Sequence, residues 1–328
     1  MNRKLWCIGG GKGGVGKSIF TLGLGLCLSR LGRKIILMDL DLGGANLHTL
    51  MGVRYPALTL EDFFLKRVSR LEDLIIDTQI EGMGLICGAD DILGAANPTY
   101  SQKIRALQQI VDLPADLVLL DLGAGTSFNI LDFFNYSPGK LCILTNQTTS
   151  LQNVYGFIKS ALYRHISREF PRDHDLLDLL QPLDPQNGNE NLDSMEEIRA
   201  HLEDGERRAR LDRLLQDFTV HLVVNMVKGP RDLQAPVIIQ KVCESFLSIR
   251  PEVLGHITSD PEVEQAVNRM VPFPLGRQDS PAARDLGRIA ALLLEKSGLA
   301  SQVHAGVRAR AAVDGSKPWH VHQSGASI

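Results

Sequence analysis

The residues best suited to chemistry form one short stretch near the start of the chain, Gly11–Ser18, with the sequence GKGGVGKS. It fits the pattern G-x-x-x-x-G-K-[ST], in which glycines let backbone N–H groups turn inward around a phosphate. In such a loop, Lys17 would place a cation on the β- and γ-phosphates, and the Ser18 hydroxyl would be a magnesium ligand. The sequence therefore predicts a phosphate cradle made of Gly11, Lys12, Gly13, Gly14, Val15, Gly16, Lys17 and Ser18.

Carboxylates follow two apolar runs that are typical of buried strands. Asp39 and Asp41 come directly after Ile35–Met38, and Asp121 comes after Leu117–Leu120. Proteins with parallel sheets bind ligands at the carboxyl ends of their strands, so we expect these carboxylates to lie near the phosphate loop. A structural capping role is the alternative for either Asp39 or Asp41. The expected protein ligands of Mg²⁺ are Ser18, Asp39 and Asp121.

The elements that must position these residues alternate along the chain. Apolar runs predict strands at 5–8, 35–38, 85–87, 117–120, 141–145, 221–225 and 253–257, with a short edge strand at 74–76. Helical patterns fall at 18–31, 101–111, 127–134, 151–167, 233–247, 262–269 and 282–296. This alternation predicts an α/β fold of right-handed βαβ units, with a doubly wound, mostly parallel sheet that is covered on both faces.

The second lysine of the loop narrows the class of protein. Gly11–Ser18, with its Lys12, resembles the deviant phosphate loop KGGxGK[ST] of the MinD/ParA family of P-loop ATPases. Asp39–Asn46 fits D-x-D-x-x-x-x-N and is similar to the first switch of that family. Asp121–Gly125 is similar to the second switch, D-x-x-A-G, with Gly123 where many members carry Pro or Ala. We expect the glycines of this second loop to permit movement when a γ-phosphate leaves.

The resemblance covers residues 5–157 and 220–296 and is nearest to the MinD and FlhG-like flagellar-number branch, judged by Gly43–Gly52 and Asp260–Pro274. It implies that Lys12 reaches the nucleotide of a partner subunit and that Asp41 orients the attacking water. It also implies that Asn225 recognises the adenine edge. A solvated charge is the alternative for Lys12, and a satisfied turn is the alternative for Asn225. The catalytic residues that the resemblance implies are Lys12, Lys17 and Asp41.

The remaining chain departs from this pattern in two places. We expect one P-loop ATPase domain over 1–298, with a helical insertion at 168–219 and a flexible tail at 299–328. Within the insertion, Asp184–Asp193 is turn-forming, and Ser194–Phe218 is a charged helical pattern with one apolar stripe. This stripe either packs on the parent domain or docks a protein partner. The tail is rich in Ala, Gly, Ser and His without sustained apolar periodicity, so it predicts disorder and puts membrane attachment in question.

Composition limits the alternatives. The chain has 328 residues and a formal net charge of −3, which gives no overall basic footprint for nucleic acid. Five cysteines are scattered without a C-x-x-C pair, which favours reduced core residues over an iron–sulfur site. No signal peptide or membrane-spanning run is recognised, so we expect a cytoplasmic protein that contacts a membrane at most peripherally. A basic cluster, Lys66, Arg67 and Arg70, is a solvated face or a DNA or membrane contact.

These observations favour a switch that binds and hydrolyses ATP with Mg²⁺, slowly and with stimulation by a partner. The resemblance implies a homodimer that forms with ATP and positions a protein partner at a division site, cell pole or flagellar machinery. A DNA-partitioning ATPase of ParA type is a second interpretation. A metabolic ATP-dependent enzyme is a third, because the same fold hosts such enzymes.

Overall fold

The computed structural model describes residues 4–41, 44–88, 98–180, 194–274 and 279–300. The described strands form one eight-stranded sheet in the order β3-β4-β2-β5-β1-β6-β7-β8. Neighbouring strands are parallel except for β3 and β4. The strands are β1 (Leu5–Gly9), β2 (Ile35–Leu40), β3 (Ile76–Asp77), β4 (Met83–Ile86), β5 (Leu117–Leu122), β6 (Gly139–Leu144), β7 (His221–Val227) and β8 (Glu252–Thr258).

The central strands are continuous apolar runs because both faces of the sheet are covered. Every residue of β1, β2, β5 and β6 is buried. The predicted doubly wound, mostly parallel sheet is confirmed. The edge strand begins at Ile76 instead of Leu74, because Leu71–Leu74 forms a 3₁₀ helix, η1.

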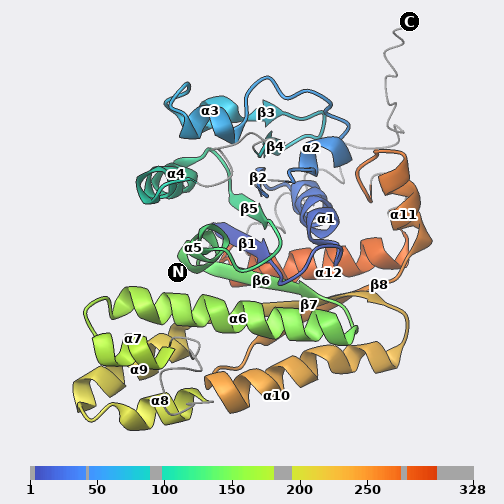
Figure 1. The fold of residues 1–328 in the computed structure, drawn as a ribbon. Helices are drawn as coiled ribbons and strands as arrows, with labels where there is room; N and C mark the ends of the chain where they lie inside the picture. The colour runs from blue at the N-terminus through green and yellow to red at the C-terminus, as the bar shows by residue number, and fades with distance from the viewer. Residues whose placement is uncertain (1–3, 42–43, 89–97, 181–193, 275–278, 301–328) are drawn as a thin grey trace, which may run out of the picture.

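Two helical layers cover the sheet, and each has its own hydrophobic core. Helices α1 and α12 pack on one face, whereas α4, α5, α6 and α10 cover the other (Figure 1). The helices are α1 (Lys17–Arg30), α2 (Leu47–Leu50), α3 (Leu60–Phe64), α4 (Tyr100–Asp112), α5 (Phe128–Tyr136), α6 (Thr148–Glu169), α7 (His174–Leu180), α8 (Met195–His201), α9 (Gly205–Asp217), η2 (Pro230–Gln234), α10 (Ala235–Leu247), α11 (Pro261–Asn268) and α12 (Pro281–Lys296). No described helix is long and apolar enough to cross a membrane.

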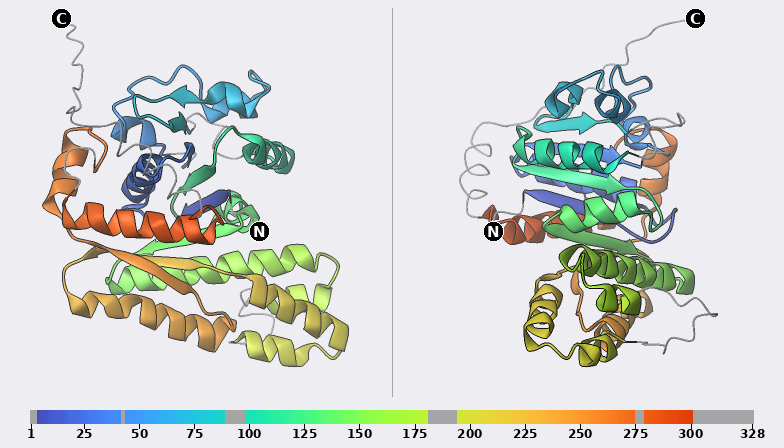
Figure 2. Two further views of the ribbon diagram at one scale, coloured as in Figure 1. Left: turned by 180° about the vertical axis from the view of Figure 1, so that it is seen from behind. Right: turned by 60° about the vertical axis from the view of Figure 1, so that its left-hand side comes forward.

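Helices α7, α8 and α9 lie beside α6 and α10, at the end of the molecule opposite α3 (Figures 1 and 2). The charged helical pattern over Ser194–Phe218 forms two helices, α8 and α9. The break lies at Leu202–Asp204, because Asp204 starts α9 by accepting the N–H of Glu206. Helix α7 was not expected. Asp184–Asp193 and the tail from 301 onward lie outside the described residues.

The apolar stripe of the insertion faces inward. Its residues belong to the same core as α6 and α10, which supports packing on the parent domain over a docking surface. The buried stripe residues are Ile198, Leu202, Leu211, Leu214, Leu215 and Phe218.

Candidate functional site

The loop between β1 and α1 needs its glycines for two separate reasons. Gly14 and Gly16 have φ of +80° and +89°, in the left-handed region that L side chains rarely adopt. At Gly11, a Cβ atom would collide with the backbone carbonyl of Asn153 in α6. At Gly13 and Gly14, no atom of the described residues lies within 4 Å of the place where a Cβ would stand. A loop of this shape can receive an anion on backbone N–H groups at the start of α1.

Lys17 is a buried cation with weak compensation. Its side chain is 8% exposed, and its Nζ donates one long hydrogen bond, 3.3 Å, to the carbonyl oxygen of Lys12. Burial lowers the pKa of Lys17, and the charges of Asp121 and Asp41 oppose that shift. In the part of the chain that the structure describes, no carboxylate lies within salt-bridge distance of it. A buried ammonium in this state suits an incoming phosphate.

Asp121 lies at the end of β5 and contacts the start of α1. Its Oδ1 is 3.1 Å from the hydroxyl of Thr21, and the Ser18 hydroxyl lies close enough to lower the pKa of the carboxyl group. Burial, with the charge of Asp39, raises the pKa of Asp121 to about 7, whereas Ser18, Thr21 and Lys17 act in the opposite direction. A hydroxyl and a carboxylate are the oxygen donors that Mg²⁺ prefers. The structure therefore places two of the three expected magnesium ligands, Ser18 and Asp121, near each other.

Thr21 is a residue of the site that sequence reasoning missed. It is fully buried, and its hydroxyl lies 2.9 Å from the Lys17 carbonyl as well as 3.1 Å from Asp121. The available signal was its position one helical turn after Lys17, on the side of α1 that faces the sheet.

Asp39 is fully buried at the end of β2, and backbone amides engage both of its carboxylate oxygens. Oδ1 accepts the N–H of Asp41 at 3.0 Å, whereas Oδ2 accepts those of Asn46 at 2.9 Å and Leu47 at 3.0 Å. Burial raises the pKa of Asp39, and these three hydrogen bonds oppose the shift. The geometry matches the capping alternative. Asp39 fixes the end of the first switch and the start of α2 close to Asp121.

Asp41 lies half-buried between the two switch segments. Burial raises the pKa of its carboxyl group, and the charge of Lys17 counteracts that shift. The Asp41 carboxylate thus lies close enough to the phosphate loop for the charge of Lys17 to act on its pKa. Lys12, by contrast, is exposed at the rim of the loop.

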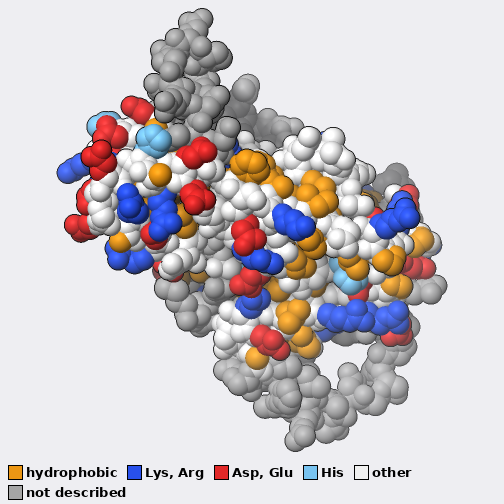
Figure 3. Space-filling view, turned by 90° about the horizontal axis from the view of Figure 1, so that it is seen from below, with side chains coloured by type: hydrophobic (Ala, Val, Ile, Leu, Met, Phe, Trp, Pro, Cys, Tyr) orange, Lys and Arg blue, Asp and Glu red, His pale blue; other side chains and the backbone are white. Residues whose placement is uncertain are grey.

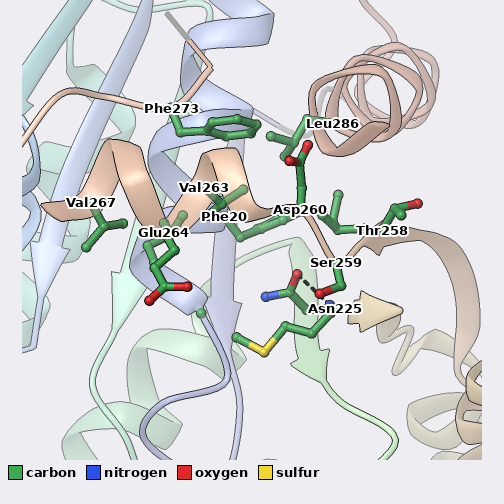
Figure 4. A pocket seen from close by; sticks show the side chains of 14 residues that line it. Phe20, Asn225, Thr258, Ser259, Asp260, Val263, Glu264, Val267, Phe273 and Leu286 are labelled. Carbon is green, nitrogen blue, oxygen red and sulfur yellow. Dashed lines mark hydrogen bonds between the residues drawn. The ribbon is translucent and has the colours of Figure 1, made fainter. Parts of the chain in front are cut away.

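A pocket of about 370 Å³ opens beside the phosphate loop (Figure 4). Its polar lining comes from Asn225, near the end of β7, from the segment Thr258–Asp260, which begins at the last residue of β8, and from Glu264 in α11. Asn225 Nδ2 donates to the carbonyl of Val15 at 2.8 Å, and its Oδ1 accepts the N–H of Met226 at 2.9 Å. The structure therefore ties Asn225 to the phosphate loop and also to the backbone of Met226, at the irregularity near the end of β7. The apolar lining includes Phe20, Ile257, Val263, Val267, Phe273 and Leu286.

Other candidate groups are already satisfied. Arg67 pairs with Glu61 and Asp62, and Arg70 pairs with Glu72, so two members of the predicted basic cluster are neutralised locally. All five cysteines lie among the described residues, where they are buried and form no disulfide bond. Among the described residues, no three His, Cys, Asp or Glu side chains gather as a metal site.

Comparison with known proteins agrees with this geometry. The chain is 30% identical over 152 residues to antiactivator FleN of Pseudomonas aeruginosa, covering 46% of this chain and 53% of FleN. It is 32% identical over 165 residues to flagellum site-determining protein YlxH of Helicobacter pylori, covering 48% and 53%. The chain thus spans about half the length of these curated relatives.

Solved structures show the same fold. The septum site-determining protein MinD from Pyrococcus horikoshii, complexed with Mg-ADP, has a TM-score of 0.59 at 19% identity, covering 90% of this chain and 98% of that chain. The family model described as the CobQ/CobB/MinD/ParA nucleotide binding domain matches residues 6–273. The chain therefore belongs to the CobQ/CobB/MinD/ParA nucleotide-binding domain family, and its similarity to FleN and YlxH supports the flagellar-number branch.

Proposed function

We propose that this chain binds ATP with Mg²⁺, hydrolyses it slowly, and forms an ATP-dependent homodimer that positions a cellular partner. The observation that carries the proposal is Lys17, a buried cation beside a glycine-lined loop with no carboxylate partner among the described residues. Burying an uncompensated charge is costly, so such a group is retained where a ligand of opposite charge completes it.

The names of relatives support the positional part of the proposal. YlxH is called a flagellum site-determining protein, and several relatives are called putative septum site-determining proteins. Partner positioning at a cell pole, division site or flagellar machinery is proposed for this chain on that similarity. Hydrolysis stimulated by the partner is part of the same proposal.

The residues near Asp121 fit a magnesium ion. The Ser18 hydroxyl and Asp121 would hold it, whereas Asp39, with its oxygens engaged by backbone amides, would keep the first switch in place beside it. When bound, Mg²⁺ supplies positive charge next to the β- and γ-phosphate oxygens. Lys17 would bind the same phosphates from inside the loop, and Asp41 would orient the attacking water.

The pocket beside Asn225 would hold the adenine base. Its volume of about 370 Å³ lies within the range of small-ligand pockets, and its walls are mostly apolar, as an aromatic base requires. Asn225 would present its amide to the base edge from a position fixed by Val15. Lys12, exposed at the rim, would reach the phosphates of the second subunit.

Three observations weigh against the DNA-partitioning alternative. The net charge is −3, and Arg67 and Arg70 are paired within the chain. On the face seen from below, Lys and Arg are interspersed with Asp, Glu and apolar side chains, without a continuous basic surface (Figure 3). Such mixed charge does not favour binding to a phosphate backbone.

Light scattering with ATP and with ADP tests the proposal. Wild type is expected to dimerise with Mg·ATP and to stay monomeric with ADP. Lys12→Ala should retain ATP binding through Lys17 but lose dimerisation, because a lysine that acts across an interface contributes only when both subunits are present. Lys241→Ala, at an exposed position of α10, is the matched control and should behave as wild type.

A wild type that binds ATP yet stays monomeric would refute the dimer switch and favour a metabolic enzyme of this fold. Dimerisation of Lys12→Ala at the wild-type level would refute the assigned role of Lys12.

A further inference from the structure

The β8–α11 segment, Thr258–Asp260, lines the pocket beside the phosphate loop (Figure 4). It begins at the end of β8, the last strand of the described sheet, where outward-pointing amides have no further strand to pair with. Ser259 donates its N–H inward, to the carbonyl of Val227 at 2.8 Å. The preceding amide, that of Thr258, therefore points outward and needs an acceptor from another element.

Asp285 in α12 supplies that acceptor. Its Oδ2 accepts the N–H of Thr258 at 2.9 Å and the hydroxyl of Thr258 at 2.7 Å. Asp285 is only 5% exposed, so an amide that lost this partner would be left without water to replace it. The other oxygen, Oδ1, accepts from Arg288 at 2.9 Å, and the Arg288 side chain is 69% exposed. Oδ2 therefore contacts the β8–α11 segment, whereas Oδ1 contacts an exposed side chain of α12 itself.

A second contact ties the other end of the β8–α11 segment to the same helix. Asp260 Oδ2 accepts the N–H of Ala282, in the first turn of α12, at 3.3 Å. Its Oδ1 accepts the N–H of Glu262, at the start of α11, at 3.0 Å. Thr258 and Asp260 are thus both attached to α12. The contacts of Asp285 are shorter than that of Ala282, so removal of the Asp285 side chain should release the segment more effectively.

Helix α12 also packs on the helix that follows the phosphate loop. Leu286, next to Asp285 in α12, lines the pocket, and a Cβ atom at Gly23 of α1 would lie 2.8 Å from its Cδ1. Figure 4 shows Thr258, Asp260 and Leu286 around the same pocket. Helix α12 therefore fixes the β8–α11 segment relative to α1 and the phosphate loop.

We propose that Asp285 is a positioning residue for nucleoside binding, which holds the β8–α11 segment on α12 so that the pocket is shaped before a base enters. This inference rests on the proposed function, which assigns adenine to this pocket. A segment that is already ordered loses little conformational freedom when a ligand binds, whereas a released segment must first be ordered. The phosphate loop does not include this segment, so phosphate binding should not depend on Asp285.

The test compares the binding of ATP with that of inorganic triphosphate, which carries the phosphates without the nucleoside. In calorimetric titrations with Mg²⁺, Asp285→Ala should bind ATP about 10-fold more weakly than wild type, because the segment must be ordered on binding. Its affinity for inorganic triphosphate should be that of wild type. Asp285→Asn should restore ATP binding, since an amide oxygen can accept both hydrogen bonds of Thr258. Arg288→Ala removes the partner of Oδ1 alone, so it is the matched control and should bind both ligands as wild type does.

Unchanged ATP affinity in Asp285→Ala would overturn the inference. An equal loss of affinity for inorganic triphosphate would also overturn it, because the effect would then not be confined to the nucleoside. Asp285→Leu fills the same space with an apolar side chain and should show the same difference between the two ligands, so it replaces Asp285→Ala if that variant does not fold. If neither variant folds, Asp285 is required for folding as a whole and the inference is wrong.

Hydrogen exchange without nucleotide separates the inference from the proposed function. The amides of Thr258–Asp260 should exchange faster in Asp285→Ala than in Arg288→Ala, whereas the amides of β5 should exchange equally in both variants. Equal exchange at Thr258–Asp260 would refute the role of Asp285 in ordering the segment. If wild type does not bind ATP, the proposed function fails, and the exchange comparison still decides whether Asp285 orders the segment.

Discussion

Asp121 at the end of β5 and Asp132 on α5 are two buried carboxylates on adjacent elements. Their electrostatic environments are opposite. Both side chains are 1% exposed. Asp132 accepts hydrogen bonds from Lys103 Nζ at 2.6 Å and Arg164 Nε at 3.0 Å, and it forms an ion pair with Arg168 Nη2 at 3.0 Å. Burial alone would raise its pKa, but these cations outweigh burial and lower it. Asp121 has one hydroxyl donor, Thr21, and a like charge nearby, and burial raises its pKa to about 7.

The difference distinguishes a completed structural cluster from a site that a ligand would complete. The Asp132 cluster joins α4, α5 and α6 with each charge opposed inside the protein. At the strand ends, Lys17 and Asp121 are both buried and neither is paired with an opposite charge among the described residues. Retaining such charges destabilises the free protein, which is typical of binding sites.

Removing Asp132 should produce the largest loss of stability. Asp132→Ala leaves Lys103 buried without its partner, and breaking a buried ion pair costs about 3–5 kcal/mol. Urea unfolding measures the loss. Glu244→Ala, which breaks an exposed pair with Arg250, is the control and should cost about 0–1 kcal/mol. If both variants lost equally little stability, the Asp132 cluster would not be the strongly stabilising structural cluster described here.

Neutralising Asp121 should increase the stability of the ligand-free protein, in contrast to the loss expected for Asp132→Ala. Asp121→Asn is expected to stabilise the ligand-free protein at pH 8 by up to about 4 kcal/mol, at about 1.4 kcal/mol for each tenfold change in the proton equilibrium. The raised pKa means that the folded protein takes up a proton between pH 7 and 4 that the unfolded chain does not. The stability of wild type therefore rises as pH falls through this window, and the advantage of the variant disappears. Thermal unfolding at pH 8 and pH 5 without Mg²⁺ or nucleotide measures both effects.

A loss of stability in Asp121→Asn at pH 8 would show that Asp121 is as well compensated as Asp132. The same variant should weaken the Mg²⁺ dependence of ATP binding, because an amide is a poorer magnesium ligand than a carboxylate.

The smallest expected effect belongs to Thr21. Thr21→Val removes a hydroxyl that supports Asp121, a change of about 1 kcal/mol for one hydrogen bond. It should weaken Mg²⁺-dependent ATP binding modestly, and Thr21→Ser should restore it. Equal Mg²⁺ dependence in the Val and Ser variants would exclude a role of this hydroxyl at Asp121.

The sequence predicted the parts of the fold that local patterns encode. Long apolar runs such as Leu117–Leu120 and Leu141–Thr145 have one compatible placement, in a buried parallel strand, and the structure confirms them. The short helices α2 and α3 were not predicted, since four or five residues carry no helical period. The break between α8 and α9 depends on the N-cap at Asp204. This local signal was missed in the sequence because the charged helical pattern continues on both sides of it.

The sequence predicted those site residues that belong to a motif of fixed spacing. It did not predict the contacts between segments that are far apart in the chain. Gly11–Ser18 and Asp121 follow from their positions at strand ends. The contacts of Asn225 with Val15 and of Asp41 with Gly123 join residues far apart in the chain, so only the register of the sheet places them together. The Asp132 cluster was missed for the same reason, because its cations come from two other helices.

The central claim is that the uncompensated charges of Lys17 and Asp121 form a nucleotide site. Calorimetric titration with ATP, with and without Mg²⁺, is its most direct test. Wild type should bind ATP, and Mg²⁺ should strengthen the binding. Lys17→Ala should give no binding heat, because the buried cation that meets the phosphates is gone. Absence of binding by wild type, or tight binding by Lys17→Ala, would contradict the account.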